Sequence, residues 1–316
     1  MRHLFLHLVP LFPLLFGAIT WSGMLIERRK RIVRATVLEE LAGGLFVVSL
    51  SIFFLLIWPW SFVGNRTRYA IHLGLTVVVA HTVIASMRAY RAGKLLPGRG
   101  GWIVSGFLIL MTLACLLGVG HVFLAPFPDD QILIAFPLEG DWYVGQGGPS
   151  VLTNAHVPYK SQRYALDLVK VGPDGKSFKA DGRQLQDYYS WGQPVRAPLS
   201  GIVIESVKTY PDNLPGLGDD RDSRGNHVLI RSAAGEIVLL AHLRMESVLV
   251  KEGELVQEGQ LMAEVGNSGN TTAPHLHIDA TRATQSGPVS LTMTFKDIGA
   301  SLRSQRRGAT LGRSKE

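Results

Sequence analysis

Two periodicities divide the chain into two parts. The first 126 residues contain four uncharged apolar stretches, at roughly 3–26, 41–60, 70–87 and 102–126. Each comes close to the length of about 20 residues with which a helix crosses a bilayer. The pattern therefore predicts a helical region of four transmembrane spans over residues 1–126.

The first of these stretches allows a second interpretation. It contains Pro10 and Pro13 and could be a secretion signal instead of a span. The block ERRKRIVR follows it directly, and such a basic block is atypical after a cleaved leader. We therefore interpret residues 3–26 as a retained span.

The charges of the loops predict the orientation of the spans. Residues 27–40 and 88–101 are rich in Arg and Lys, whereas residues 61–69 hold only Arg66 and Arg68. Positively charged loops stay in the cytoplasm. We therefore expect the N-terminus, and everything after residue 126, to lie outside the cytoplasm.

From residue 127 onward the apolar runs become short and are separated by clusters of Gly, Pro, Asn and Asp. Examples are QILIAFPL, YALDLVKV, NHVLIRS, EIVLLAHL and LHIDATRA. Such runs are typical of strands and turns. We expect an all-β outer domain over residues 127–295, followed by a basic, flexible tail over residues 296–316. The acidic stretch 211–226 is either a solvated loop or a cation site.

Composition and charge exclude several classes of protein. The net charge is +7, but the basic residues flank the predicted spans or lie in the tail, so nucleic-acid binding is not expected. The single cysteine, Cys115, excludes an intramolecular disulfide and a cysteine-based zinc site. His72 and His81 are nine residues apart and half a turn out of phase on a helix, so ordinary interior contacts are favoured over a metal pair.

The outer domain contains a set of residues suited to binding a metal. His275 and His277 alternate in the run PHLH, so both side chains would leave one face of a strand. Asp167 lies between apolar neighbours in YALDL, where a carboxylate is costly unless it is paired or bound to a metal. Two histidines and one carboxylate, with a fourth position open, are typical of catalytic zinc.

Several spaced motifs over about residues 135–290 resemble the LytM/lysostaphin-type M23 zinc metallopeptidases. They are the strand LLAHL, the hairpin VLVKEGELVQEGQLMAEVG, the turn GNSGN and the run PHLH, in that order. The resemblance implies a LytM-like antiparallel sheet or half-barrel. It also implies one bound Zn²⁺, with Asp167 and His277 as ligands and His242 and His275 as catalytic residues.

One position departs from the family pattern, which begins with His-x-x-x-Asp and places both residues on zinc. Four residues before Asp167 this chain has Arg163, which cannot bind a metal. The nearest upstream histidine is His156, and a loop that folds back could deliver it to the same position. We therefore expect His156, Asp167 and His277 as the metal ligands. The alternative is a catalytically inactive domain that binds cell wall or activates a partner amidase.

The resemblance also implies a substrate and a location. We expect a hydrolase of peptide bonds in peptidoglycan, attached to the lipid bilayer of the bacterial cytoplasmic (inner) membrane by several spans, with its C-terminal domain outside the cytoplasm or in the periplasm. Asp279 shares the strand parity of His277 and either orients a histidine or faces solvent. His227 is expected to be structural, and Asn154 is a candidate for blocking the metal in a latent form. No protein partner is predicted.

Overall fold

The computed structural model describes residues 35–219, 222–298 and 305–312. The chain divides into two compact units, Met1–Leu124 and Ala125–Glu316. We describe each unit separately.

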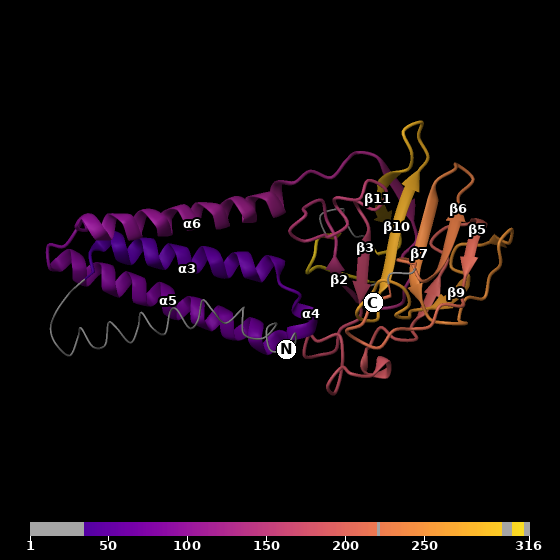
Figure 1. Cartoon of the computed structure of the whole chain (residues 1–316), viewed down its shortest axis with the longest axis horizontal. Helices are drawn as coiled ribbons and strands as arrows, with labels where there is room; N and C mark the ends of the chain where they lie inside the picture. The colour runs from indigo at the N-terminus through magenta and orange to yellow at the C-terminus, as the bar shows by residue number, and fades with distance from the viewer. Residues whose placement is uncertain (1–34, 220–221, 299–304, 313–316) are drawn as a thin grey trace. The chain divides into compact units, whose positions relative to one another are not determined.

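The first unit is helical (Figure 1). It contains α3 (Val37–Ile57), the short α4 (Trp60–Val63), α5 (Asn65–Arg91) and α6 (Arg99–Leu124). Among the described residues, α3, α5 and α6 are long and apolar enough to cross a membrane, and they match the predicted spans at 41–60, 70–87 and 102–126. The predicted span at 3–26 lies outside the described residues, so the count of four is not confirmed.

Local sequence explains how this unit is built. A capping box begins α3, in which the Thr36 side chain accepts a hydrogen bond from the backbone of Glu39 and the Glu39 side chain bonds the Thr36 backbone. Gly44 allows α3 to approach α5 closely, since a Cβ at Gly44 would lie 2.1 Å from Thr82 Oγ1. His81 is buried, whereas His72 is exposed and bonds the Arg68 carbonyl. His81 thus lies in the interior, as expected, whereas His72 does not.

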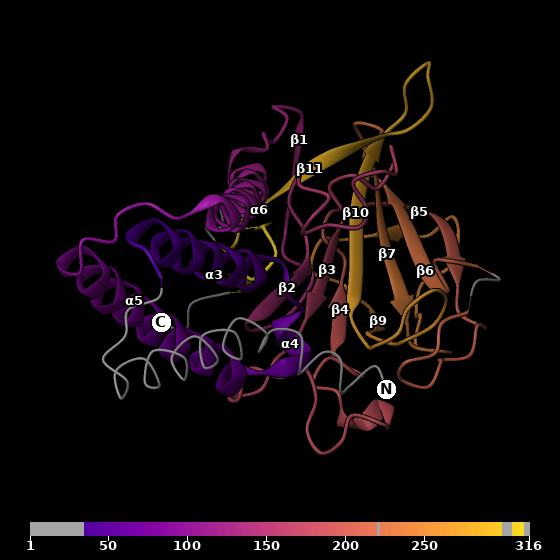
Figure 2. The same ribbon diagram turned by 60° about the vertical axis from the view of Figure 1, so that its left-hand side comes forward.

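The second unit is built on a ten-stranded sheet (Figures 1 and 2). Its main path runs β12-β2-β3-β10-β7-β6-β5-β8, and β11 pairs with β10 and with β1. All pairs in it are antiparallel except β1 with β11, and β4 and β9 form a separate antiparallel pair. The strands are β1 (Gln131–Ile134), β2 (Trp142–Gln146), β3 (Leu166–Val169), β4 (Pro194–Arg196), β5 (Gly201–Val207), β6 (Asn226–Arg231), β7 (Ile237–Leu243), β8 (Leu255–Val256), β9 (Leu261–Glu264), β10 (Leu276–Arg282), β11 (Val289–Phe295) and β12 (Thr310–Leu311).

Alternation along the central strand β10 separates the core from the candidate site. Leu276, Ile278 and Ala280 are fully buried in the hydrophobic core, whereas His277 and Asp279 leave the other face. A shift of one residue would place an imidazole and a carboxylate in the core and remove apolar side chains from it. Leu276 and Ile278 each contribute about 1.5–3 kcal/mol when fully buried. The core therefore fixes which residues face the site.

The prediction of a flexible tail over residues 296–316 is wrong for residues 305–312. This segment returns to the sheet, where Thr310 and Leu311 of β12 pair with Tyr143 and Trp142 of β2. Leu311 is 1% exposed and belongs to the core. The prediction rested on the abundance of basic residues and overlooked this apolar anchor.

Candidate active site

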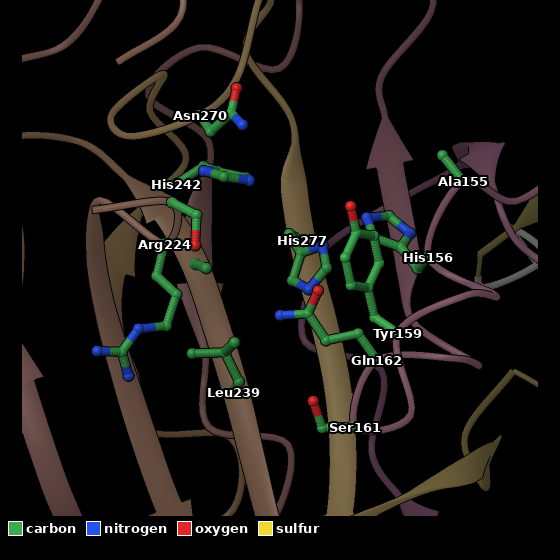
Figure 3. Close-up of a pocket in the computed structure, with 12 residues that line it drawn as sticks. Ala155, His156, Tyr159, Ser161, Gln162, Arg224, Leu239, His242, Asn270 and His277 are labelled. Carbon is green, nitrogen blue, oxygen red and sulfur yellow. The ribbon is translucent and has the colours of Figure 1, made fainter. Parts of the chain in front are cut away.

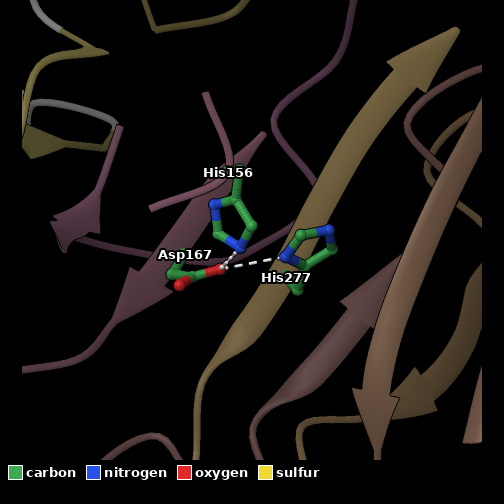
Figure 4. Close-up of side chains that lie close together, drawn as sticks. All are labelled: His156, Asp167 and His277. Carbon is green, nitrogen blue, oxygen red and sulfur yellow. Dashed lines mark hydrogen bonds and ion pairs between the residues drawn. The ribbon is translucent and has the colours of Figure 1, made fainter. Parts of the chain in front are cut away.

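Asp167 and His277 lie directly opposite each other on neighbouring strands. The register of β3 and β10 pairs the two residues, and both side chains leave the face away from the core. His277 Nδ1 lies 3.0 Å from Asp167 Oδ1 (Figure 4). Backbone pairing alone therefore brings together two residues that are 110 positions apart in the sequence.

His156 reaches the same carboxylate from the loop between β2 and β3. Its Nε2 atom lies 3.8 Å from Asp167 Oδ1, and its ring centroid lies 4.8 Å from that of His277. One ligand atom from each of His156, Asp167 and His277 lies within 4.8 Å of the others (Figure 4). Arg163 is exposed and donates from Nε to the Val157 carbonyl. The structure thus brings together the three expected ligands, and Arg163 is not among them.

In both His277 and His156, the ring nitrogen that faces away from Asp167 contacts an oxygen of another side chain. His277 Nε2 lies 3.2 Å from Asp279 Oδ2, and Asp279 is 4% exposed. His156 Nδ1 lies 2.8 Å from Asn154 Oδ1. Histidines that bind metals typically donate their other N–H to such an acceptor, which fixes the ring orientation. Of the two readings of Asp279, the structure supports the orienting one.

Asn154 supports His156 and does not block the cluster. Its side chain is 1% exposed, and its amide nitrogen donates to the carbonyls of Gly148, Arg163 and Ala165. Its oxygen accepts from both the backbone and the ring of His156. With both of its polar atoms occupied, Asn154 is bound in place, and the idea that it blocks the metal is not supported.

The electrostatics of the cluster are dominated by buried, oppositely charged groups. Burial alone would raise the pKa of Asp167, but the neighbouring His156 and His275 and the hydrogen bonds from His275 and His277 hold it well below its ordinary value. Burial alone would lower the pKa of His277, but hydrogen bonds to Asp167 and Asp279 raise it to about 10. Without a metal, the site therefore favours an ionised carboxylate beside an imidazolium.

His275 and His242 complete a group of four imidazoles. His275 Nε2 lies 3.5 Å from Asp167 Oδ1, while its Nδ1 lies 2.8 Å from the Ala273 carbonyl. His242 Nδ1 lies 2.9 Å from the Ser268 carbonyl, and its ring centroid is 4.8 Å from that of His275. A carbonyl can only accept, so each Nδ1 carries a hydrogen. The Nε2 atom of neutral His242 therefore presents a lone pair, whereas His275 Nε2 faces the Asp167 carboxylate.

Strand alternation does not explain how His242 reaches this group. Ala241 pairs with His277 in the register of β7 and β10, so regular alternation would turn His242 towards the opposite face. Instead His242 has φ +60°, in the left-handed region, and its backbone bonds Arg224 and Gly266 outside the regular ladder. Burial, followed by the neighbouring His275 and His277, holds the pKa of His242 well below its ordinary value. This imidazole is therefore neutral near pH 7.

A pocket of about 450 Å³ opens beside the cluster (Figure 3). His156 and Tyr159 lie on one side of β10, and Arg224, Leu239 and His242 lie on the other, with His277 between them. The Arg224 guanidinium forms a bidentate pair with Glu205 at 3.0 and 3.1 Å. Sequence reasoning identified the histidines but missed Tyr159 and Arg224, because no periodicity places these two residues at the site.

Two other candidates have structural roles. His227 is 0% exposed, with Nδ1 2.7 Å from the Gly225 carbonyl and Nε2 3.1 Å from Glu205 Oε1. In the acidic loop, Asp212 accepts backbone hydrogen bonds from Met245 and Asn267, and Asp222 accepts one from Arg224. These two carboxylates hold turns of the loop in place.

Comparison with known proteins gives a match to part of this unit. Residues 185–289 match the model of peptidase family M23. The peptidoglycan DD-endopeptidase ShyB of Vibrio cholerae is 32% identical over 125 residues, which are 40% of this chain and 26% of that protein. The DD-endopeptidase ShyC of the same organism is 42% identical over 88 residues, which are 28% of this chain and 17% of that protein.

Among solved structures, the antimicrobial peptidase lysostaphin from Staphylococcus simulans is 23% identical. The match covers 42% of this chain and 43% of that chain, with a TM-score of 0.28. A similarity at this level carries no argument. The chain thus spans about a quarter or less of the curated relatives named above.

Proposed function

The chain contains a domain of peptidase family M23, and from this premise we propose that it is a membrane-anchored zinc endopeptidase that cleaves peptide bonds of peptidoglycan outside the cytoplasmic membrane. The observation that carries the proposal is the convergence of His156, Asp167 and His277 beside the imidazoles of His242 and His275. A domain that only binds cell wall would not need five such groups at one point.

The donor set fits zinc. Two imidazole nitrogens and one carboxylate oxygen form a usual catalytic zinc set that leaves one position open. With bonds of about 2.0–2.2 Å, tetrahedral donors lie about 3.4 Å apart. The distances from Asp167 Oδ1 to His277 Nδ1 and His156 Nε2 are 3.0 and 3.8 Å, so small adjustments suffice. Asp279 and Asn154 already hold the nitrogens that would not bind the metal.

The residues around the cluster divide the work of proton transfer. A bound zinc ion supplies Lewis acidity, which polarises a carbonyl and lowers the pKa of water towards about 7. His275, 3.5 Å from Asp167 Oδ1, is placed to accept the proton of the attacking water at Nε2. His242 is the second acid–base group. Its low pKa makes its protonated form a strong donor to the departing amine or to a developing oxyanion.

Two observations support the substrate and the location. The curated relatives are named as peptidoglycan DD-endopeptidases. Arg91 ends α5, Lys94 lies in the loop that follows and Arg99 begins α6, so the positive-inside rule favours a cytoplasmic position for this turn. If α6 spans the membrane, the unit that begins at Ala125 lies outside, where it faces the cell wall.

The test uses the full chain, purified in detergent and incubated with isolated peptidoglycan. We expect one zinc per chain and new amine and carboxyl ends, identified by product mass spectrometry, which a chelator abolishes and added zinc restores. The His156→Ala variant should bind zinc much more weakly, through the remaining Asp167 and His277, and should create no new ends. Zinc-loaded chain that creates no new ends would contradict the enzyme proposal and support a binding role.

A further inference from the structure

His156 is the one proposed ligand that no strand carries. We call residues 147–157, which follow β2, the ligand loop. Within it, Asn154 Oδ1 accepts hydrogen bonds from the His156 backbone at 3.0 Å and from His156 Nδ1 at 2.8 Å. The position of His156 therefore depends on the position of the Asn154 side chain.

Asn154 is in turn fixed at both ends of the loop region. Its Nδ2 atom donates to the Gly148 carbonyl at 3.0 Å, and to the carbonyls of Arg163 at 3.2 Å and Ala165 at 3.3 Å. Ala165 precedes β3 and is buried, so one end rests on the sheet. The other end rests on Gly148, which has φ +86° and lies outside any strand. The rigidity of the ligand loop therefore depends on the contacts that hold Gly147 and Gly148 in place.

The C-terminal segment, residues 305–312, packs on these two glycines. A Cβ at Gly147 would lie 2.4 Å from the Gln305 carbonyl oxygen, and one at Gly148 would lie 3.2 Å from Arg306 Cγ. Such close approach is open only to glycine. Any displacement of the segment would therefore remove the support beneath the Gly148 carbonyl that Asn154 binds.

The C-terminal segment is itself well anchored. Gly308 N donates to the Val144 carbonyl at 2.9 Å, and Val144 N donates to the Ala309 carbonyl at 2.8 Å. Leu311 is buried in the core. Arg306 also donates to the Ala125 carbonyl at 3.1 Å, and its guanidinium lies 5.0 Å from the centre of the Phe127 ring. One short segment thus joins the residues that follow α6 to the ligand loop.

We propose that the C-terminal segment is a positioning element for the metal site, which holds His156 in place through Gly147, Gly148 and Asn154. The inference rests on the proposed function, because it requires His156 to be a ligand. The ligand loop and the C-terminal segment both lie outside residues 185–289, the part that matches the family model. In this chain the two segments form one structural unit that supplies the third ligand.

The test uses chains that keep both units and are shortened only at the C-terminus. One ends at Ser304 and lacks the C-terminal segment, and the control ends at Gly312 and keeps it. Each is made with His156 and with His156→Ala. Zinc affinity is measured by competition with a chelator, and the Co²⁺-substituted chains are compared by visible absorption. With His156 present, we expect the chain ending at Ser304 to bind zinc about 10–100-fold more weakly than the control, the usual effect of losing support for a ligand. In the His156→Ala background the two truncations should agree within about twofold, because the segment acts through His156.

Three results would overturn parts of the account separately. Equal zinc affinity of the two truncations with His156 present removes the positioning role alone. An equal loss in both backgrounds shows a general loosening and also removes it. A control chain whose zinc affinity does not depend on His156, or that binds no zinc, overturns the proposed metal site itself.

A second variant covers the case in which the chain ending at Ser304 does not fold. Gly147→Ala keeps the full C-terminal segment and places a methyl group 2.4 Å from the Gln305 carbonyl oxygen, where it also presses on the ends of the Val144 and Leu166 side chains. The same loss of zinc affinity, confined to the His156 background, is expected. Asn154→Ala should behave in the same way, and full zinc affinity in both variants would contradict the proposal.

Discussion

The strands and the ligand loop position the proposed metal ligands in different ways. Asp167 and His277 are opposed in the register of β3 and β10, which the hydrophobic core fixes. His156 depends on one asparagine side chain and on the packing of a distant segment. The sheet therefore provides a fixed pair of donors, whereas the third donor is built from contacts that differ from the usual family pattern. The two kinds of ligand should respond differently to substitution.

The largest effect is expected when a ligand is removed from the sheet. His277→Ala leaves Asp167 and Asp279 buried without their shared imidazole, so we expect loss of zinc and of activity. We also expect the metal-free protein to lose about 3–5 kcal/mol of unfolding free energy, the usual result of breaking a buried ion pair.

His156→Ala provides the contrast to that variant. It should also bind zinc much more weakly and lose activity, but the metal-free protein should lose only about 1 kcal/mol, because one hydrogen bond to Asn154 disappears. Urea unfolding of the two variants in the presence of chelator measures the difference. Equal losses of unfolding free energy would contradict the distinction between sheet and loop.

The next largest effect separates proton transfer from metal binding. His275→Ala should keep zinc at one per chain and reduce kcat by about 10²–10⁴-fold, since a positioned general base is lost. His72→Ala is the matched control, because His72 is exposed on α5 and bonds only the Arg68 carbonyl in the described contacts. Loss of zinc from His275→Ala would move this residue into the ligand set.

These variants test residues that the sequence predicted with unequal success. Alternation placed His277 and Asp279 on one face, and the isolated carboxylate Asp167 in an apolar run indicated a partner, as the structure has it. His242 needed a left-handed residue that no strand periodicity predicts. Proximity in sequence suggested His156, but only the fold-back of its loop brings it to Asp167. The flexible tail was predicted from its many basic residues, and that composition gives no sign that one apolar residue, Leu311, is buried in the core.

A smaller effect is expected when Asp279, which contacts the His277 ring, is replaced. Asp279→Asn keeps the shape of the side chain but removes the charge that holds His277 Nε2. Zinc affinity should fall by about 10–100-fold, the usual range for partners of metal-binding histidines. Chelator competition measures the affinity. Asp222→Asn is the control, because this carboxylate contacts Arg224 within its own turn. An unchanged affinity would show that Asp279 does not orient the ligand.

A separate test is the pH dependence of the metal-free protein. The pKa of His277 is raised to about 10, so its contribution to stability is complete below its ordinary value of 6.5 and disappears as the pH rises through about 10. The pKa of Asp167 is lowered, so its contribution is present above 3.8 and disappears as the pH falls below that value. Urea midpoints should decline from pH 6.5 to 10, and less so in His277→Ala. A flat alkaline profile in the wild-type chain would contradict the ion pair.

The most direct test of the central claim is anomalous diffraction at the zinc edge from crystals of the zinc-loaded full chain. We predict one peak per chain, at about 2.0–2.2 Å from His156 Nε2, Asp167 Oδ1 and His277 Nδ1. A peak bonded to other atoms, or one without His156 among its ligands, would contradict the account.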